Sequence, residues 1–294
     1  MPDSVESVAS MLEEQNYIAD VGLSTSLFLS LKMQKALFLE GEPGVGKTEV
    51  AKVLSRIFNA PLIRLQCYEG LDINHAVYEW NYPRQLLEIQ AHQNQPNGTS
   101  SVTDNIFTEK FLLKRPLLNA IDNSHKTSPV LLIDELDRAD EEFESFLLEL
   151  LSDFQITIPE IGTLRADHKP IIIITSNRTR EIHDALKRRC VYYWIEYPSR
   201  EKEIEIVQTK MPGISKRLTE QIVDFVQAVR DQELYKLPGV AETLDWAEAL
   251  GHLNAQTLDA NVVNATLGII LKYQDDVDKI YGSTAEALVQ QAVN

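Results

Sequence analysis

GEPGVGKT, residues 41–48, is the stretch that decides the fold. It fits the pattern G-x-x-x-x-G-K-[ST], in which glycines let consecutive backbone N–H groups turn toward an anionic phosphate. In this pattern Lys47 places a positive charge on the β- and γ-phosphates, and Thr48 offers a hydroxyl to Mg²⁺. The sequence therefore predicts a phosphate-binding loop. The alternative is a glycine turn followed by a chance Lys-Thr pair.

The residues on either side of the loop support a phosphate site. Residues 35–40, KALFLE, form a short apolar run that is typical of a buried strand. Residues 49–58 place apolar side chains at helical spacing. A strand, a glycine loop and a helix N-terminus in this order bind phosphate. The residues expected to contact the nucleotide are Gly41, Glu42, Pro43, Gly44, Val45, Gly46, Lys47, Thr48 and Glu49.

Composition limits the class of protein. The chain has 294 residues, of which 44% are hydrophobic, so it can bury a sizeable core. Its net charge of −16 argues against general binding to nucleic acid or a membrane surface, because both need a basic face. The two cysteines, Cys67 and Cys190, indicate neither a disulfide framework nor a zinc site. With no signal peptide in the N-terminal residues, we expect a cytoplasmic protein.

A second landmark is the buried strand predicted over residues 130–133, which ends in Asp134 and Glu135. Open α/β sheets place their ligands at the carboxyl ends of the strands. We expect Asp134 to orient Mg²⁺ through water and Glu135 to polarise the attacking water. The alternative is an acidic helix N-terminus, where carboxylates are favoured by the helix dipole.

A third apolar strand is predicted over residues 171–174, after a hairpin at residues 155–163. Thr-Ser-Asn follows it, and Asn177 is our candidate for holding the attacking water or the γ-phosphate. Three apolar strands that end near phosphate chemistry imply a parallel sheet covered by helices. Another strand is expected at residues 61–65.

Two segments carry open alternatives. Residues 66–111 are a long mixed segment with an aromatic cluster at Tyr78, Trp80 and Tyr82, which either grips a partner or caps a core. Within it, residues 92–101 are rich in turn formers and read as a loop. Near the N-terminus, helices are predicted over residues 4–16 and 23–34. Between them, Tyr17 and Ile18 either cover an adenine ring or simply pack.

The chain changes character near Pro198. Before it, a helix over residues 117–123, a helix over 140–154, paired arginines at Arg188 and Arg189, and a strand over 191–195 are expected. After it, the pattern predicts helices alone, over residues 200–210, 214–230, 240–253 and 261–273. We therefore predict an α/β nucleotide-binding domain at residues 1–198 and an all-helical lid at 199–294.

These motifs, in this order, resemble those of the AAA+ ATPases, a family of P-loop NTPases. LEGEPGVGKT at residues 39–48 and LIDELDRA at 132–139 are similar to the MoxR branch. So is the hairpin at residues 156–163 before ITSN at 174–177. LQCYEGL at residues 65–71 and YEWNYPRQLL at 78–87 resemble accessory ATPases of carbon monoxide dehydrogenase maturation.

The resemblance implies a hexameric ring with ATP and Mg²⁺ between subunits. An arginine of one subunit then reaches the γ-phosphate held by its neighbour, and Arg189 matches that position, with Arg188 as the second candidate. The alternative for either arginine is compensation of a helix C-terminus. The resemblance also implies a partner with a von Willebrand factor A domain and a metalloenzyme client.

The chain departs from the family at the start of a late helix, where an arginine usually faces the nucleotide. Glu242 stands there, and Arg230 is the last arginine of the chain. We hypothesise that Lys236 takes over this contact, because its point charge also suits phosphate. The alternative is that the contact is missing and the lid is weakly coupled.

The leading function is an ATPase that remodels a protein client through ring motion. A second hypothesis is a nucleic-acid motor. The net charge of −16 argues against it, and hydrolysis stimulated by DNA would support it. A third is an ATP-gated binding switch with little turnover, which steady-state hydrolysis with and without a partner distinguishes.

Overall fold

The structure is a computed structural model that describes residues 2–93 and 106–293. The chain folds into two compact units. The first comprises mainly Thr25–Glu40 and Val50–Tyr193, and the second joins Val5–Ser24 and Gly41–Glu49 to the C-terminal residues from Trp194. Most of the loop predicted at residues 92–101 lies outside the described residues. The domain boundary near Pro198 stays a prediction.

The first unit is built on a five-stranded sheet with the order β2-β5-β8-β1-β9. β1 runs parallel to β8, β8 to β5, and β5 to β2, with Leu37 beside Ile173 and Leu131 beside Ile172. All three apolar strands predicted from the sequence are therefore neighbours. The strands are β1 (Ala36–Gly41), β2 (Leu62–Gln66), β5 (Val130–Asp134), β8 (Ile171–Ser176) and β9 (Cys190–Ile195).

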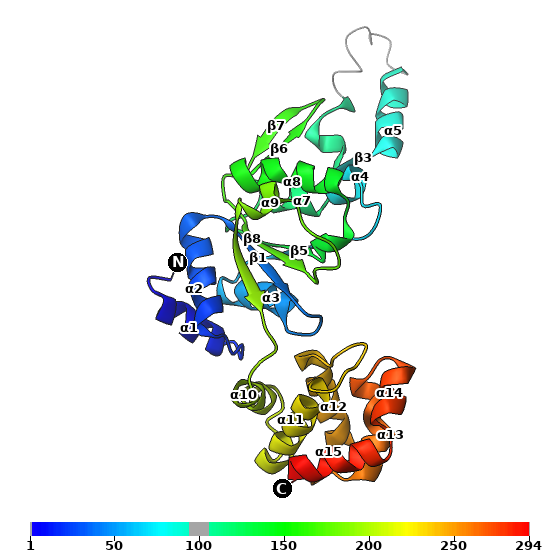
Figure 1. Cartoon of the computed structure of the whole chain (residues 1–294). Helices are drawn as coiled ribbons and strands as arrows, with labels where there is room; N and C mark the ends of the chain where they lie inside the picture. The colour runs from blue at the N-terminus through cyan, green and yellow to red at the C-terminus, as the bar shows by residue number, and fades with distance from the viewer. Residues whose placement is uncertain (1, 94–105, 294) are drawn as a thin grey trace. The chain divides into compact units, whose positions relative to one another are not determined.

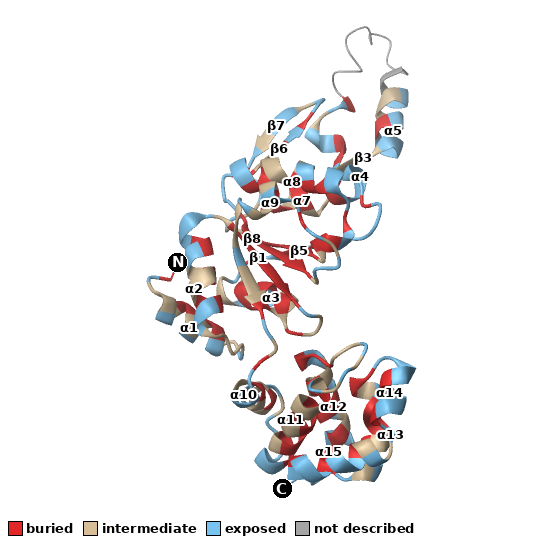
Figure 2. Ribbon diagram, viewed as in Figure 1, coloured by how far each residue is buried: buried red, intermediate tan, exposed pale blue. Residues whose placement is uncertain are grey.

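Helices cover both faces of this sheet. Every residue of β1, β5 and β8 is buried, which is the pattern of a parallel sheet covered on two sides (Figure 2). Figure 1 shows α7, α8 and α9 on one side of β5 and β8, with α3 on the other. The helices of this unit include α2 (Val21–Met33), α3 (Lys47–Ile57), α7 (Pro116–Ala120), α8 (Glu141–Asp153) and α9 (Asp184–Lys187).

Local sequence explains where α8 begins and ends. The Asp140 carboxylate accepts a hydrogen bond of 2.8 Å from the backbone N–H of Phe143, which satisfies a donor at the helix N-terminus. Phe154 adopts the left-handed conformation and closes the helix, and β6 (Gln155–Ile158) follows directly. With β7 (Gly162–Arg165), β6 forms the predicted hairpin. Residue 154 therefore caps the helix rather than extending it.

The segment after β2 is more regular than its sequence indicates. It contains α4 (Ile73–Ala76), β3 (Tyr78–Trp80) and α5 (Tyr82–Gln93), and β3 pairs with β4 (Leu112–Lys114). The aromatic cluster divides, because Trp80 is 6% exposed in the core and Tyr82 is 60% exposed. Short 3₁₀ turns lie at Glu109–Phe111 and Leu136–Arg138. The predicted helix over residues 117–123 was too long, since Ile121 already leaves helical geometry.

The C-terminal part of the second unit is helical, as predicted. Its core forms around Trp246, whose ring is fully buried and whose Nε1 donates a 2.8 Å hydrogen bond to Thr266 Oγ1. The predicted helix over residues 261–273 was wrong at its end, because Leu271 turns to extended backbone and buries its side chain. The helices are α10 (Arg200–Lys210), α11 (Lys216–Arg230), α12 (Val240–His252), α13 (Ala260–Ile270), α14 (Gln274–Ile280) and α15 (Ser283–Val293).

The N-terminal residues of the second unit form α1 (Val5–Glu13), which is shorter than predicted. The lead-in that follows is tied to α10, because Lys202 Nζ lies 2.8 Å from Asp20 Oδ2. Asp20 Oδ1 also accepts a 2.8 Å hydrogen bond from the N–H of Leu23 in the first turn of α2. Among the described helices, none is long and apolar enough to span a bilayer.

Candidate functional site

The predicted phosphate loop joins the end of β1 to the start of α3. Gly44 and Gly46 have φ angles of +80° and +94°, in the region that L side chains rarely adopt. Lys47 is 6% exposed, and its ammonium donates 2.7 Å hydrogen bonds to the carbonyls of Gly41 and Glu42. The lysine charge is therefore held inside the loop at the N-terminus of an 11-residue helix, where an anion is favoured.

Helix α12 begins against this loop, within the second unit. The backbone N–H of Ala241 donates a 3.0 Å hydrogen bond to the carbonyl of Gly44. A Cβ on Gly239 would stand 2.7 Å from the carbonyl oxygen of Pro43, so no larger residue fits without moving the backbone. Glu242 Oε2 accepts a 2.9 Å hydrogen bond from Gly239 N–H and would lie 2.6 Å from a Cβ on Gly44. The residue at the expected arginine position thus caps α12 beside the loop.

A buried ion pair supports the turn before α12. Arg230 binds both carboxylate oxygens of Glu203 at 2.6 and 2.7 Å, and the two side chains are 6% and 0% exposed. Arg230 Nε also donates a 2.7 Å hydrogen bond to the carbonyl of Pro238. The last arginine of the chain is therefore a structural residue of the helical part, and it fixes the backbone that reaches the loop.

Lys236 and the N-terminal candidates lie in the same unit as the loop. The backbone N–H of Lys236 donates a 3.1 Å hydrogen bond to the buried Asp276, and its side chain is half-buried. Tyr17 and Ile18 are half-buried in the segment that joins α1 to α2. Their roles toward a nucleotide stay predictions.

The carboxylate pair lies at the carboxyl end of β5, in the first unit. Asp134 is 3% exposed, and both its oxygens are engaged. Thr175 Oγ1 donates a 2.6 Å hydrogen bond to Oδ1. Arg64 of β2 binds Oδ2 through Nε at 3.0 Å and Nη2 at 2.6 Å. A buried carboxylate with a charged partner and a hydroxyl stays fixed in place.

Glu135 has an uncommon backbone conformation for a residue with a side chain. Its φ and ψ are 54° and 52°, and its N–H donates a 2.9 Å hydrogen bond to Thr175 Oγ1. Its Oε2 accepts from Gln66 Nε2 at 3.0 Å and from Arg138 Nη1 at 3.2 Å. Left-handed backbone at such a residue costs energy and persists where neighbours enforce it, often at functional sites.

Asn177 follows β8, the strand beside β5. Its backbone N–H donates a 3.2 Å hydrogen bond to Asp137 Oδ1, while Thr179 binds the other oxygen of that carboxylate. Asp137 is 3% exposed and anchors the turn that carries Asn177. The structure therefore brings Asp134, Glu135 and Asn177 to one edge of the sheet. Their assignment as site residues stays a prediction.

The two candidate finger arginines differ in their surroundings. Arg189 is half-buried and donates to Ser152 Oγ at 2.5 Å and to the Ala185 carbonyl at 2.7 Å. Arg188 is exposed at the end of α9, and its guanidinium has no hydrogen-bond or ion-pair partner within residues 2–93 and 106–293. Arg188 can therefore reach another molecule without breaking a contact of its own chain.

Cys67 follows β2, and both burial and the negative charge of the nearby carboxylates raise the pKa of its thiol. Burial raises the pKa of its thiol to about 12, and the charge of Asp134 adds to that effect. Its backbone N–H donates a 2.8 Å hydrogen bond to the Asp134 carbonyl. The thiol stays protonated at neutral pH, so it is structural rather than nucleophilic.

Sequence reasoning missed four residues of this sheet edge: Arg64, Gln66, Thr175 and Asp137. The signal for the first two was present, because Arg64 and Gln66 interrupt an otherwise apolar strand. The register then brings Gln66 beside Asp134. Thr175 and Asp137 gave no separate signal, since each lies within two residues of one already singled out.

The donor chemistry of both residue groups suits a magnesium nucleotide. In the second unit, the loop offers backbone N–H groups, the Lys47 charge and the Thr48 hydroxyl. In the first unit, Asp134 offers a carboxylate, and hydroxyl and carboxylate oxygens are ligands that Mg²⁺ prefers. The described residues contain no metal-binding cluster of three or more His, Cys, Asp or Glu side chains.

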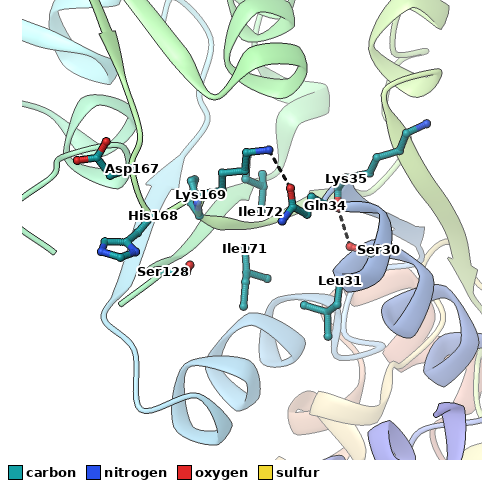
Figure 3. Close-up of a pocket in the computed structure, with 11 residues that line it drawn as sticks. Ser30, Leu31, Gln34, Lys35, Ser128, Asp167, His168, Lys169, Ile171 and Ile172 are labelled. Carbon is teal, nitrogen blue, oxygen red and sulfur yellow. Dashed lines mark hydrogen bonds between the residues drawn. The ribbon is translucent and has the colours of Figure 1, made fainter. Parts of the chain in front are cut away.

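A cavity of about 330 Å³ lies elsewhere, at the amino ends of β8 and β1 (Figure 3). Ile171, the first residue of β8, and Lys35, just before β1, are among its lining residues. Lys169 Nζ donates a 2.8 Å hydrogen bond to Gln34 Oε1, and both residues line the cavity. It is separate from the carboxylates, which stand at the opposite end of the sheet.

Comparison with known families identifies the chain. Residues 36–190, more than half of the chain, match the model of the family described as AAA domain (dynein-related subfamily). The chain belongs to this family. The matched residues run from β1 through the phosphate loop, the carboxylate pair and Asn177 to the paired arginines. The family match and the sheet order together establish an AAA-type P-loop core followed by helices.

Individual relatives are distant. An uncharacterized protein of Staphylococcus epidermidis is 25% identical over 66% of this chain and 66% of its own length. The gas vesicle ATPase GvpN of Haloferax mediterranei is 24% identical over 75% of this chain and 64% of its own. The aligned part thus spans about two thirds of each relative. A mutant of RuvB from Thermotoga maritima has a TM-score of 0.49 and 15% identity, covering 94% of this chain and 75% of that one.

Proposed function

We propose that the chain is a Mg²⁺-dependent ATP hydrolase of the AAA+ type. The observation that carries this proposal is the loop geometry, with Gly44 and Gly46 in the left-handed region and a buried Lys47 at a helix start. A carboxylate pair at the carboxyl end of β5 supplies the second half of the chemistry. The distant likeness to a protein named a gas vesicle ATPase supports the same activity.

Each residue has a role that its chemistry suits. In the proposal, Lys47 binds the β- and γ-phosphates, Thr48 and Asp134 hold the metal, and Glu135 takes the proton of the attacking water. The bound Mg²⁺ neutralises and orients the phosphates. Asn177 positions the water. Gln66 and Arg138 both donate to Oε2 of Glu135, so these two contacts set the orientation of the carboxylate that acts as the base.

The proposed site is completed by a second copy of the chain in a ring, most simply a hexamer. An arginine finger supplied in trans raises phosphoryl-transfer rates by roughly 10³–10⁵. Arg188 is the better candidate on geometry, because Arg189 is already bonded to Ser152 and Ala185. Lys236 remains our candidate for the lid contact that Glu242 does not provide.

The biological role we propose is remodelling of a protein client, as the resemblance to the MoxR branch implies. A partner with a von Willebrand factor A domain and a client metalloenzyme, with carbon monoxide dehydrogenase maturation as the nearest example, belong to this proposal. A cytoplasmic location fits it. The support at residue level is the resemblance of residues 39–48, 65–71 and 132–139 to the motifs of these proteins.

Equilibrium binding of fluorescently labelled ATP, followed by phosphate release, tests the proposal. Wild-type protein should bind ATP and release phosphate only with Mg²⁺, and Lys47→Ala should lose binding because the loop loses its charge. Lys52→Ala, in the same helix, is the control for removal of a lysine. A wild-type protein that does not bind ATP would overturn the proposal.

The same assay separates the alternatives. Phosphate release that rises with added DNA would favour a nucleic-acid motor. ATP binding with turnover that stays near zero, with or without partner, would favour a binding switch. Proteins retained by a Glu135→Gln variant from lysate would identify the client.

A further inference from the structure

Arg64 stands between the two carboxylates and solvent. It lies on β2, the edge strand of the sheet, and its side chain is 53% exposed while that of Asp134 is 4% exposed. Nε and Nη2 both bind the same oxygen, Oδ2, at 3.0 and 2.6 Å. The guanidinium thus covers the side of Asp134 that Thr175 does not occupy.

Arg64 also connects Asp134 to Glu135 through one intermediary. Its Nη2 donates a 2.5 Å hydrogen bond to Gln66 Oε1, and Gln66 Nε2 donates a 3.0 Å hydrogen bond to Glu135 Oε2. The chain of contacts runs from Asp134 through Arg64 and Gln66 to Glu135. An event that moves Arg64 therefore removes one partner of Gln66, and loosens its hold on Glu135.

We propose that Arg64 is an internal counter-ion that Mg²⁺ displaces from Asp134 when the metal nucleotide binds. The inference rests on the proposed function. A cation and a guanidinium compete for the same carboxylate oxygen, since each needs its lone pairs and its negative charge. Displacement frees Gln66 from Arg64, so metal arrival at Asp134 is transmitted to Glu135. Arg64 is a positioning residue that links metal binding to the orientation of Glu135.

This arrangement predicts opposite effects of Arg64 on the two forms of the nucleotide. Without metal, Arg64 neutralises Asp134 and reduces its repulsion of the phosphates. With metal, Arg64 opposes binding. Arg64→Ala should therefore weaken binding of ATP in EDTA and lower the Mg²⁺ concentration needed for half-saturation. Each change should be about two- to fivefold, the size expected for a partly exposed ion pair.

The experiment is a titration of labelled ATP at a series of Mg²⁺ concentrations, read by fluorescence anisotropy. Arg64→Lys keeps the charge without the two-nitrogen contact and should fall between wild type and Arg64→Ala. Arg138→Ala is the matched control, because it removes a nearby arginine that contacts Glu135 but not Asp134. Its half-saturating Mg²⁺ concentration should equal that of wild type.

An Arg64→Ala protein with the wild-type Mg²⁺ requirement, or a higher one, would overturn the proposal. If Arg64→Ala does not fold, as judged by circular dichroism, the Arg64→Lys titration decides: an unchanged requirement contradicts displacement. Failure of the proposed function looks different, because wild-type protein would then not bind ATP at any Mg²⁺ concentration.

Discussion

Thr175 is the residue that connects the carboxylate pair to the neighbouring strand. Its hydroxyl donates to Asp134 at 2.6 Å and accepts from the Glu135 N–H at 2.9 Å, so one side chain sets two positions. Thr175 is 1% exposed, so its hydroxyl is buried. The left-handed backbone of Glu135 is therefore held by a buried hydroxyl, and removing that hydroxyl takes one hydrogen bond from Asp134 and one from the Glu135 N–H.

Thr175→Val should cost about 1–3 kcal/mol in the free energy of unfolding, because both of these hydrogen bonds are lost. Turnover should fall as well, since Glu135 loses its position. Denaturant unfolding and phosphate release measure the two effects. Thr175→Ser keeps the hydroxyl and should lie close to wild type. Equal stability of the valine and serine variants would contradict this role.

Tyr192 gives the protein a pH dependence in the alkaline range. Burial, the hydrogen bond to Glu40 and the Glu40 charge raise the pKa of its hydroxyl to about 12, above the ordinary value of 10. The unfolded chain loses this proton first, so stability from Tyr192 is complete below about pH 10 and disappears toward pH 12. The stability difference between wild type and Tyr192→Phe should shrink over that window in denaturant unfolding. A constant difference would contradict it.

Residues with a motif could be located from the sequence, and residues without one could not. Lys47, Asp134 and Asn177 each follow an apolar run, where the chain pattern alone marks them. Arg64 binds Asp134, which lies 70 positions away in the sequence, because β2 and β5 are neighbouring strands. Its role depends on strand order, which no local pattern contains.

At the scale of elements, α12 packs directly against the backbone of the phosphate loop. Gly239 has an ordinary negative φ of −85°, so only space demands a glycine. An added Cβ would stand 2.7 Å from the Pro43 carbonyl oxygen and 2.8 Å from Gly44 Cα. Both are backbone atoms, so the contact cannot relax by a rotamer change.

Gly239→Ala should therefore destabilise the protein by about 1–3 kcal/mol, the usual cost of overpacking, and weaken ATP binding. Gly251→Ala is the control in the same helix, because nothing lies within 4 Å of its Cβ. That variant should gain up to about 1 kcal/mol from helix propensity. Denaturant unfolding and labelled-ATP binding compare the two. A Gly239→Ala protein as stable as Gly251→Ala would show that the contact does not form.

The buried pair of α10 and α11 makes a second prediction at this scale. Arg230→Ala leaves Glu203, which is 0% exposed, without its charged partner, and should cost about 3–5 kcal/mol. The double variant with Glu203→Ala should recover part of that loss, because no charge is then left buried. Denaturant unfolding of the single and double variants measures it. An equal loss of unfolding free energy in the single and the double variant would contradict this role of the ion pair.

Element prediction succeeded where periodicity is strong and failed where elements are short. The buried strands β5 and β8 were correctly placed, because their apolar runs have no other explanation. β3 and β4 have three residues each, too few to show alternation. Helix α5 was missed because its exposed Leu86 and Leu87 blur the apolar face. Short elements are set by tertiary contacts rather than by local pattern.

At the scale of the whole molecule, we propose that a second copy of the chain completes the site. Arg188→Ala should keep ATP binding and lose turnover by roughly 10³–10⁵, as expected for an arginine finger. Arg189→Ala should instead lower stability, because Arg189 binds Ser152 and Ala185. Mixing Arg188→Ala with Glu135→Gln should restore some hydrolysis, since one type of interface then has both residues. Wild-type turnover by Arg188→Ala alone would contradict the assignment.

Glu135 is the residue on which the proposed hydrolysis of ATP depends, because we propose that it activates the attacking water. Single-turnover hydrolysis of radiolabelled ATP by Glu135→Gln, beside wild type, tests this role most directly. We predict that the variant binds Mg²⁺ and ATP as tightly as wild type and hydrolyses ATP about 10²–10⁴ times more slowly. Hydrolysis by Glu135→Gln at the wild-type rate would contradict it.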